Sequence, residues 1–233
     1  MKTQNVTIPA FSGGSFSAYL AAPSTQPLAG IVLIQEVLGV NAIMRQTADD
    51  YAKAGYQVIV PDLYWRLELG VQLDPEDKVQ FAKAFELNRA FDVDNGVEDL
   101  KATMLFLRQY PSITGKVGSV GFCSGGKLAY LMATRTDMDA NVSYYGVDID
   151  KYLAEAAKIQ KPLILHMSGN DEFVPSSAQA TIQEGLKDHP LVTIYRYEGV
   201  SHGFSRIGSS AYRKEAAELA RDRTLAFLKQ HLG

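Results

Sequence analysis

The segment Gly121-Phe122-Cys123-Ser124-Gly125-Gly126 stands between a short apolar run and a run with apolar residues at helical spacing. Residues 116–122 are predicted to form a buried strand and residues 124–135 a helix. Glycines two positions before and two positions after Cys123 are what a tight turn from strand to helix requires, because a Cβ at either place would collide with the neighbouring strand or helix. We therefore predict that this turn holds a reactive Cys123 in strained backbone angles.

Cys123 also has a simpler interpretation. A lone cysteine is most often a small buried hydrophobic residue, and a Gly-x-Cys-x-Gly-Gly sequence is not catalytic in every protein that carries it. With one cysteine the chain can form no internal disulfide and no thiolate metal cluster, which suits a reducing compartment. The residues that follow the other predicted strands decide between the two interpretations.

The composition is that of an ordinary soluble globular protein. Of the 233 residues, 46% are hydrophobic and 21% are charged, and the net charge of −3 leaves no basic surplus for gripping phosphates. We expect a single domain over residues 1–233, no nucleic-acid partner and, by default, a monomer. The N-terminus lacks an apolar signal core and the longest aliphatic run, residues 30–34, is too short for a membrane span, so we expect a cytoplasmic protein.

Strands and helices are predicted to alternate along the rest of the chain. Residues 4–22 alternate apolar and polar side chains around a turn at 11–14, which is typical of an antiparallel pair, here at the sheet edge. Buried strands are predicted at 29–35, 56–60, 140–145, 162–167 and 191–197, a short amphipathic piece at 149–158, and helices at 41–54, 75–90, 92–110, 175–186 and 211–228. This order predicts an α/β fold with a mostly parallel central sheet flanked by helices, in which active residues gather at the carboxyl ends of the strands.

Cys123, Asp171 and His202 each follow a predicted strand. A nucleophile, an acid and a histidine in this chain order are typical of the α/β-hydrolase triad. His202 would accept the thiol proton and pass it to the leaving group, while Asp171 would fix the imidazole tautomer and stabilise its cation. Taken singly, His202 could be an exposed loop residue and Asp171 a turn residue, but their shared position after strands favours catalysis.

Nearby groups would stabilise the thiolate of Cys123 and the oxyanion that forms at the reacting carbonyl. The histidine and the positive end of the helix that starts at Ser124 would favour the thiolate. The oxyanion would be held by the backbone N–H groups of Ser124 and Val37. Tyr145 could line a pocket or belong to the core, and His166, inside an apolar strand, is expected to be a hydrogen-bonded core residue. We expect no metal site, because no two histidines or carboxylates have a spacing that would bring ligands together.

Four motifs together resemble the dienelactone hydrolase (carboxymethylenebutenolidase) family. They are Gln35 to Asn41, Gly121 to Gly126, Asp171 to Pro175 and Ser201 to Phe204. The resemblance runs from end to end of the chain and implies a single-domain α/β-hydrolase fold without a large cap. It also implies Cys123, Asp171 and His202 as the triad, a small lactone or ester as the substrate, and no cofactor.

The same resemblance gives roles to Glu36 and Arg206. In the family, the glutamate that Glu36 matches is thought to hydrogen-bond the resting thiol and to take its proton when substrate arrives. Arg206 would pair with Glu36 or with a substrate carboxylate, and an exchange of partners would couple binding to activation. The alternative for Glu36 is a loop residue with a salt bridge at the surface.

The helix predicted at 75–90 departs from the family pattern. Family members that act on dienelactone carry a second arginine, and bulky aromatic neighbours, on the matching helix. This chain has Lys78, Phe81, Phe85 and Asn88 there, with Arg89 as the only arginine. If Phe81 takes the place of that arginine, the pocket is more apolar and a neutral ester is favoured. The residues expected to contact substrate are Arg206, Phe81, Tyr145 and Phe173.

Three functions are compatible with these features. The first is a cysteine-dependent hydrolase that opens dienelactone to maleylacetate through an acyl-enzyme at Cys123. The second keeps the triad but gives it a broader activity on small esters or thioesters, which the residues at 78–88 favour. The third is an α/β-hydrolase-like protein that binds a small ligand without turning it over. The complete triad argues against the third, because a binding protein has no need of a strained turn.

Overall fold

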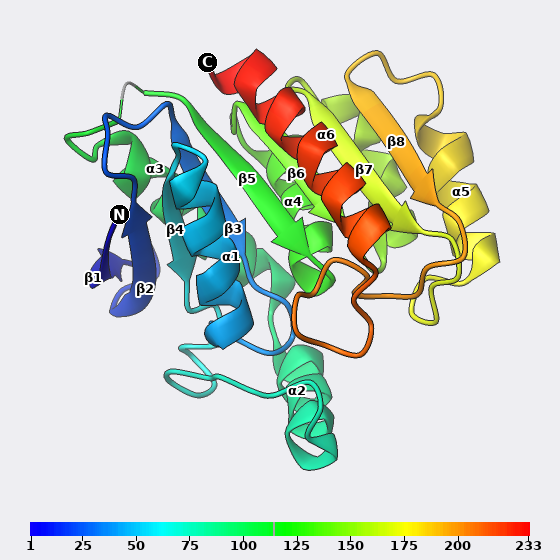
Figure 1. The fold of residues 1–233 in the computed structure, drawn as a ribbon, viewed down its shortest axis with the longest axis horizontal. Coiled ribbons are helices and arrows are strands. Elements are labelled where there is room, and N and C mark those ends of the chain that lie inside the picture. Colours follow the sequence, from blue (N-terminus) through cyan, green and yellow to red (C-terminus); the bar gives the residue numbers. More distant parts are fainter. Residues whose placement is uncertain (114) are drawn as a thin grey trace.

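The computed structural model describes residues 1–113 and 115–233, which form an eight-stranded sheet with helices on both faces (Figure 1). The strands are β1 (Lys2–Pro9), β2 (Ser15–Ala22), β3 (Gly30–Ile34), β4 (Gln57–Pro61), β5 (Val117–Phe122), β6 (Ala140–Tyr144), β7 (Leu163–Ser168) and β8 (Val192–Tyr197). The helices are α1 (Ala42–Lys53), α2 (Lys78–Ala90), α3 (Val93–Arg108), α4 (Ser124–Arg135), α5 (Ser176–Leu186), α6 (Lys214–Leu232) and a 3₁₀ helix, η1 (Ile149–Lys158).

The sheet has the strand order β1-β2-β4-β3-β5-β6-β7-β8. Strands β3 to β8 run parallel to one another, whereas β2 is antiparallel to both β1 and β4. β3 and β5 are therefore neighbours in the middle of the sheet. Every residue of β3, β4 and β5 is buried, which explains their continuous apolar sequences.

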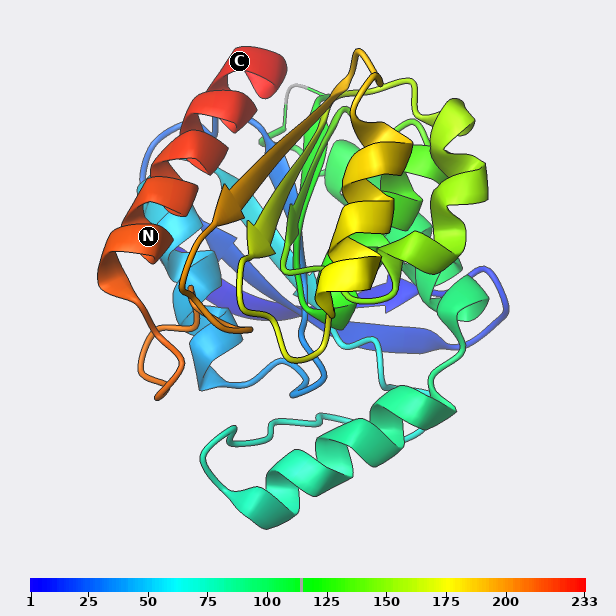
Figure 2. The same cartoon turned by 90° about the vertical axis from the view of Figure 1, so that its right-hand side faces the viewer.

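Two apolar layers pack against the sheet, because successive side chains of a strand point to opposite faces. Ile31 and Leu33 of β3 pack with residues of α1 and α6, whereas Val32 and Ile34 pack with residues of α3 and α4. Figure 1 shows α1 and α6 on the near face, and Figure 2 shows α6 and α5 on opposite sides of the sheet. The core is thus two layers divided by one sheet.

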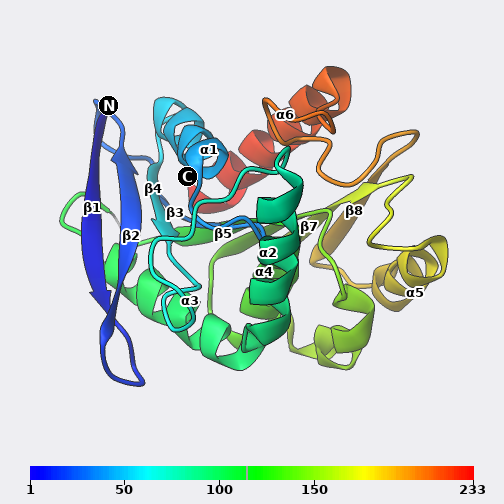
Figure 3. The same cartoon turned by 90° about the horizontal axis from the view of Figure 1, so that it is seen from below.

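Helix α2 lies outside these two layers. In Figure 1 it stands beyond the carboxyl ends of the central strands, and Figure 3, which looks onto that end, shows α2 in front of the sheet. Ala84 is buried, and the other residues of the helix are half-buried or exposed. This single helix covers the carboxyl edge of the sheet in place of a large cap.

The α/β-hydrolase fold without a large cap is confirmed, and the differences from the sequence prediction lie at element ends. The helix expected from residue 75 begins at Lys78, because the Asp77 side chain accepts hydrogen bonds from the N–H groups of Val79 and Gln80 and caps the helix there. The last helix spans Lys214–Leu232 instead of 211–228. No helix within residues 1–113 and 115–233 is both long and apolar enough to cross a membrane.

The turn between β5 and α4 has the geometry predicted for it. Cys123 has φ 56° and ψ −118°, which is strained for a residue with a Cβ. A Cβ on Gly121 would overlap the carbonyl of Gly125, and a Cβ on Gly125 would lie 2.5 Å from the carbonyl oxygens of Ile34 and Gln35. The two glycines therefore let the turn pack against the end of β3, which brings Cys123 beside the residues that follow β3.

We expect Gly125→Ala to lower the free energy of unfolding by about 3 kcal/mol, because two backbone carbonyls would have to move to admit the added Cβ. Gly185→Ala on α5 is the matched control, since its Cβ would meet the Leu153 side chain at 3.0 Å and that side chain can shift. Chemical denaturation of both variants measures the difference. Equal stability of the two variants would contradict the close backbone packing at the turn.

Candidate active site

The residues predicted to carry the chemistry gather at the carboxyl edge of the sheet. Glu36 follows β3, Cys123 follows β5, Asp171 follows β7 and His202 follows β8. Because these strands are parallel, the four loops that follow them lie along one edge. Segments that are far apart in the sequence are thereby brought together.

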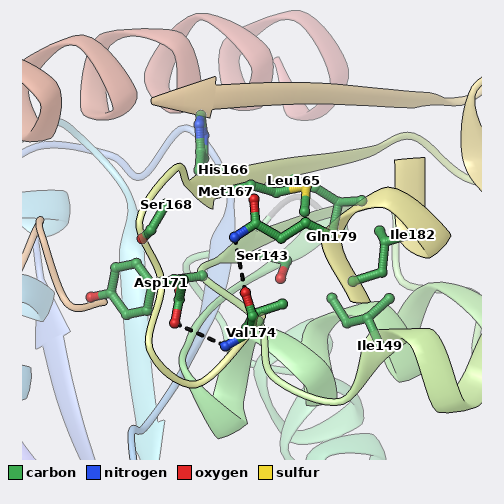
Figure 4. Close-up of a pocket in the computed structure, with 12 residues that line it drawn as sticks. Ser143, Ile149, Leu165, His166, Met167, Ser168, Asp171, Val174, Gln179 and Ile182 are labelled. Carbon is green, nitrogen blue, oxygen red and sulfur yellow. Dashed lines mark hydrogen bonds between the residues drawn. The ribbon is translucent and has the colours of Figure 1, made fainter. Parts of the chain in front are cut away.

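Asp171 and His202 form a buried pair. Nδ1 of His202 lies 2.9 Å from Oδ1 and 3.0 Å from Oδ2 of Asp171. Oδ1 also accepts hydrogen bonds from the backbone N–H groups of Phe173 and Val174, the second of which is drawn in Figure 4. The carboxylate is therefore fixed by its own loop and can orient the imidazole so that Nε2 points away from it.

The other ring nitrogen, Nε2 of His202, is buried and has no hydrogen-bond partner among the described residues. Burial disfavours the imidazolium, but the neighbouring Cys123 and Asp171 outweigh it and raise the pKa of His202 to about 10. The thiol is thus near enough to His202 to affect its charge, although no contact between Sγ and Nε2 has hydrogen-bond geometry. Nε2 is left free to exchange a proton with a group that enters the site.

Aromatic rings hold the imidazole on two sides. The rings of Tyr145 and Phe173 pack edge-on against His202, with centroid separations of 4.8 and 4.9 Å. Tyr145 has φ 38°, is 2% exposed, and its hydroxyl is 3.1 Å from Oγ of Ser205. Tyr145 therefore does not line the substrate cavity as expected; it lies behind His202 and supports it.

Glu36 and Arg206 form a second buried pair. Arg206 donates from Nε to Oε2 at 2.7 Å and from Nη2 to Oε1 at 3.1 Å. Burial disfavours the guanidinium charge, but Glu36 outweighs it, so the pKa of Arg206 is raised. The side chain of Glu36 is 5% exposed, so a surface salt bridge is the wrong interpretation for this residue. No hydrogen bond joins Glu36 to Cys123 in the described chain, and both carboxylate oxygens are bonded to Arg206.

Two backbone donors lie on either side of Cys123. The N–H groups of Val37, after β3, and Ser124, at the start of α4, donate to no backbone carbonyl within the described residues. Val37 lines the same cavity as Cys123. Both groups are thus available to an oxygen atom bound above the thiol.

A cavity of about 430 Å³ opens above Cys123. It lies between the carboxyl edge of the sheet and α2, and an ordinary small-molecule site has about this volume. Its lining residues include Cys123, His202, Arg206, Val37, Phe81, Phe85, Asn88, Phe173, Glu76 and Glu172. Phe81 packs against Phe85, and Phe85 against Phe173, with ring centroids 5.0 and 5.6 Å apart. One wall of the cavity is therefore aromatic.

A much smaller cavity, of about 10 Å³, lies behind Asp171 (Figure 4). The Oγ atoms of Ser143 and Ser168, which line it, are buried and have no hydrogen-bond partner among the described residues. This volume holds about one water molecule, so the cavity cannot admit a substrate.

Three residues that line the cavity, Glu172, Glu76 and Ser210, were not predicted from the sequence. Glu172 accepts a hydrogen bond from the backbone N–H of His202 and lines the cavity. Its position directly after Asp171 is the one sequence feature that could have indicated a place at the site. Glu76 accepts from the backbone N–H and from Oγ of Ser210, at 3.0 and 3.1 Å. This contact ties the segment before α2 to the loop that carries Arg206, and no sequence pattern marks it.

The profile of the dienelactone hydrolase family matches residues 16–232. The chain belongs to this family. Carboxymethylenebutenolidases from Pseudomonas putida and Pseudomonas knackmussii are each 41% identical to it over 228 residues, 98% of this chain and 97% of theirs. A crystal structure from Klebsiella pneumoniae has the same fold, with a TM-score of 0.86 over 98% of both chains at 23% identity. The resemblance drawn from the four motifs is confirmed, and this member of the family is a carboxylic ester hydrolase.

We expect the imidazole of His202 to titrate near pH 10, because Cys123 and Asp171 outweigh the effect of burial. NMR of the ring protons measures this, and the pKa should fall towards 6.5 in Asp171→Asn. His166 is the internal control, since burial and the nearby Arg223 lower its pKa to about 3.

The same shift fixes the sign of the pH dependence of stability. A folded-state pKa above the unfolded value of 6.5 means that protonated His202 stabilises the fold fully below pH 6.5, and that this contribution is lost as the pH rises through 10. A wild-type His202 that titrates at 6.5 would contradict both expectations.

Proposed function

We propose that the chain opens small lactones or enol esters through a covalent acyl-enzyme at Cys123. The observation that carries this proposal is the buried Asp171–His202 pair beside a strained Cys123, with Nε2 of His202 unbonded. A nucleophile, a base and a group that orients the base are the parts that acyl transfer through a covalent intermediate needs.

In the first half of the reaction, Sγ of Cys123 adds to the carbonyl carbon while the thiol proton passes to Nε2 of His202. The carbonyl oxygen becomes an oxyanion and accepts hydrogen bonds from the N–H groups of Val37 and Ser124. Collapse then breaks the ester C–O bond, and the departing enol oxygen takes the proton from His202. In a lactone this oxygen stays attached to the acyl chain, so ring opening leaves the whole product as a thioester.

In the second half, water adds to the thioester carbon and gives a proton to Nε2. Collapse of this adduct breaks the C–S bond, releases a carboxylic acid, and returns the proton to the thiolate. Asp171 stabilises the imidazolium in both halves without itself taking a proton. No cofactor is needed at any step, because water is the only co-reactant.

Glu36 and Arg206 would link activation to binding. Both oxygens of Glu36 are engaged by Arg206 in the substrate-free protein. A substrate carboxylate that attracted Arg206 would release Glu36, whose free carboxylate could then take the thiol proton in place of His202. This exchange would make activation of the thiol depend on a bound substrate.

Dienelactone is the first candidate substrate, with maleylacetate as its product. The support is the name carboxymethylenebutenolidase of relatives 41% identical over nearly the whole chain. The cavity of about 430 Å³ has room for a small lactone above Cys123.

We expect Cys123→Ser to lower kcat for dienelactone at least about a thousandfold, because a hydroxyl is far less acidic than a thiol. Acid-quenched turnover of the wild-type protein should contain the acyl-enzyme, which intact-protein mass spectrometry would detect as an added acyl group. His202→Gln should form less of it, because His202 takes the thiol proton. Ser168→Ala is the control, as Ser168 lies behind the pair and contacts no reacting atom. Full activity of Cys123→Ser, or no adduct in the wild-type protein, would overturn the acyl-enzyme.

A broader activity on neutral small esters or thioesters is the second candidate. The favouring observation is the charge of the cavity: Arg206 is already bonded to Glu36, while Glu76 and Glu172 have no cationic partner in the described chain. Hydrogen bonds from Ser210 lower the pKa of Glu76, so this carboxylate stays charged. With Phe81 on the facing wall, the cavity suits an uncharged ring better than an anion.

We expect Phe81→Arg to raise kcat/KM for dienelactone about tenfold relative to a neutral aryl ester, because the added cation would face the cavity and offset its carboxylates. Val79→Arg, on the same helix but 79% exposed, changes the net charge equally and should leave the ratio unchanged. Steady-state kinetics on both substrates give the ratio. An unchanged ratio in Phe81→Arg would rule out charge at this wall as the basis of selectivity.

A further inference from the structure

A second cavity, of about 330 Å³, lies on the other side of the loop that carries Arg206. Its walls come from α1 (Thr47, Asp50, Tyr51), from α6 (Ala217, Glu218, Arg221) and from the loop between β8 and α6 (Ser205, Ile207, Tyr212). Figure 1 shows α1 and α6 on the same face of the sheet with β5 visible between them. None of these residues lines the cavity above Cys123, so the two sites are separate.

The floor of this second cavity is aromatic. The rings of Phe122 and Tyr144 are stacked with centroids 4.7 Å apart and an interplanar angle of 24°. Tyr51 lies beside them, and all three side chains belong to the buried core. A flat apolar ring could lie on this floor and gain contact area at a small entropic cost.

Two side chains that can donate hydrogen bonds, Tyr51 and Arg221, lie at the cavity. Tyr51 is 5% exposed, and its hydroxyl lies beside that of Tyr144, which is 2.7 Å from Oγ1 of Thr224. A Tyr51 hydroxyl that accepts from Tyr144 keeps its own O–H for a ligand. Burial raises the pKa of Tyr51, so the hydroxyl stays protonated and can donate. Arg221 forms no ion pair within the described chain, and its charge reaches Tyr51.

The carboxylates at the rim do not cancel this positive charge. Asp50 is paired with Lys53 at 2.8 Å, and Glu218 lies 4.0 Å from Lys214. Arg221 is therefore left to attract an anion. A buried hydroxyl and a guanidinium that converge above an aromatic floor match one kind of ligand: a planar ring that carries a carboxylate.

We propose that this cavity between α1 and α6 binds a small aromatic carboxylic acid. The ring would lie on Phe122 and Tyr144, and the carboxylate would accept hydrogen bonds from the hydroxyl of Tyr51 and from Arg221. This site does not depend on the reaction proposed for Cys123, since its residues take no part in that reaction.

The site has a direct connection to the catalytic residues. Ser205 lines the second cavity, precedes Arg206, and is bonded to Tyr145, whose ring packs on His202. A ligand against Ser205 would therefore touch the support of both His202 and Arg206. Binding should change kcat without competing with substrate.

The test is a titration with benzoate, followed by calorimetry and by NMR. We expect binding in the wild-type protein that is about tenfold weaker in Tyr51→Phe and in Arg221→Gln. Arg223→Gln is the matched control: it lies on the same helix and removes the same charge, but it stacks on Tyr195 away from this cavity, so binding should be unchanged. Cyclohexanecarboxylate should bind more weakly than benzoate, because it lacks a flat ring.

Kinetics with a neutral ester separate the two cavities. Benzoate that acts at the second cavity should change kcat with KM unaltered, and Arg221→Gln should abolish the effect. Competitive inhibition that survives in Arg221→Gln would place benzoate above Cys123 and overturn the proposal, as would no binding up to about 10 mM. Thermal unfolding would reveal whether Tyr51→Phe is unstable. Arg221→Gln remains informative in that case, because Arg221 is exposed and its replacement disturbs no core packing.

Discussion

The close approach of two backbone segments at the carboxyl edge of the sheet is the constraint on which the site depends. Gly125 packs so tightly against the carbonyls of Ile34 and Gln35 that a Cβ would lie 2.5 Å from both oxygens. This contact brings the turn after β5 against the end of β3. As a result Cys123, Glu36 and Val37, which come from two different loops, share one small space. The strain at Cys123 is thus the cost of placing the thiol beside a carboxylate and a backbone donor.

Two buried pairs of opposite charge lie near the thiol. Within each pair, one charge offsets the cost of burying the other. Arg206 holds Glu36 with two hydrogen bonds, and Asp171 holds His202 with two close oxygens. A buried charge without a partner would be strongly destabilising, so neither member of a pair can move unless another charge takes its place. A substrate carboxylate is such a charge for Arg206. The chemistry proposed for Cys123 is therefore sensitive to the charge of the ligand and not only to its shape.

Much of this arrangement is readable in the sequence, because strands covered on both faces are continuously apolar and the residues proposed to be active directly follow them. The same local patterns place Cys123, Asp171 and His202 correctly after their strands. They could not predict the first residue of α2. Pro75 suits a first helical position, but the helix begins at Lys78 because the Asp77 side chain caps it there. They also could not show that Tyr145 turns behind His202 with φ 38°, or that Glu76 meets Ser210, since these depend on contacts between distant segments.

Helix α2 supplies the wall that faces Cys123 across the cavity. The residues proposed to carry the reaction stand on loops that follow buried strands. Helix α2, in contrast, buries only Ala84 and carries Phe81 and Phe85 over the cavity. A substitution on this helix changes the wall that faces the substrate but leaves the packing of β3 and β5 intact. The reaction proposed for Cys123 and its specificity would thus be set by different elements of one chain.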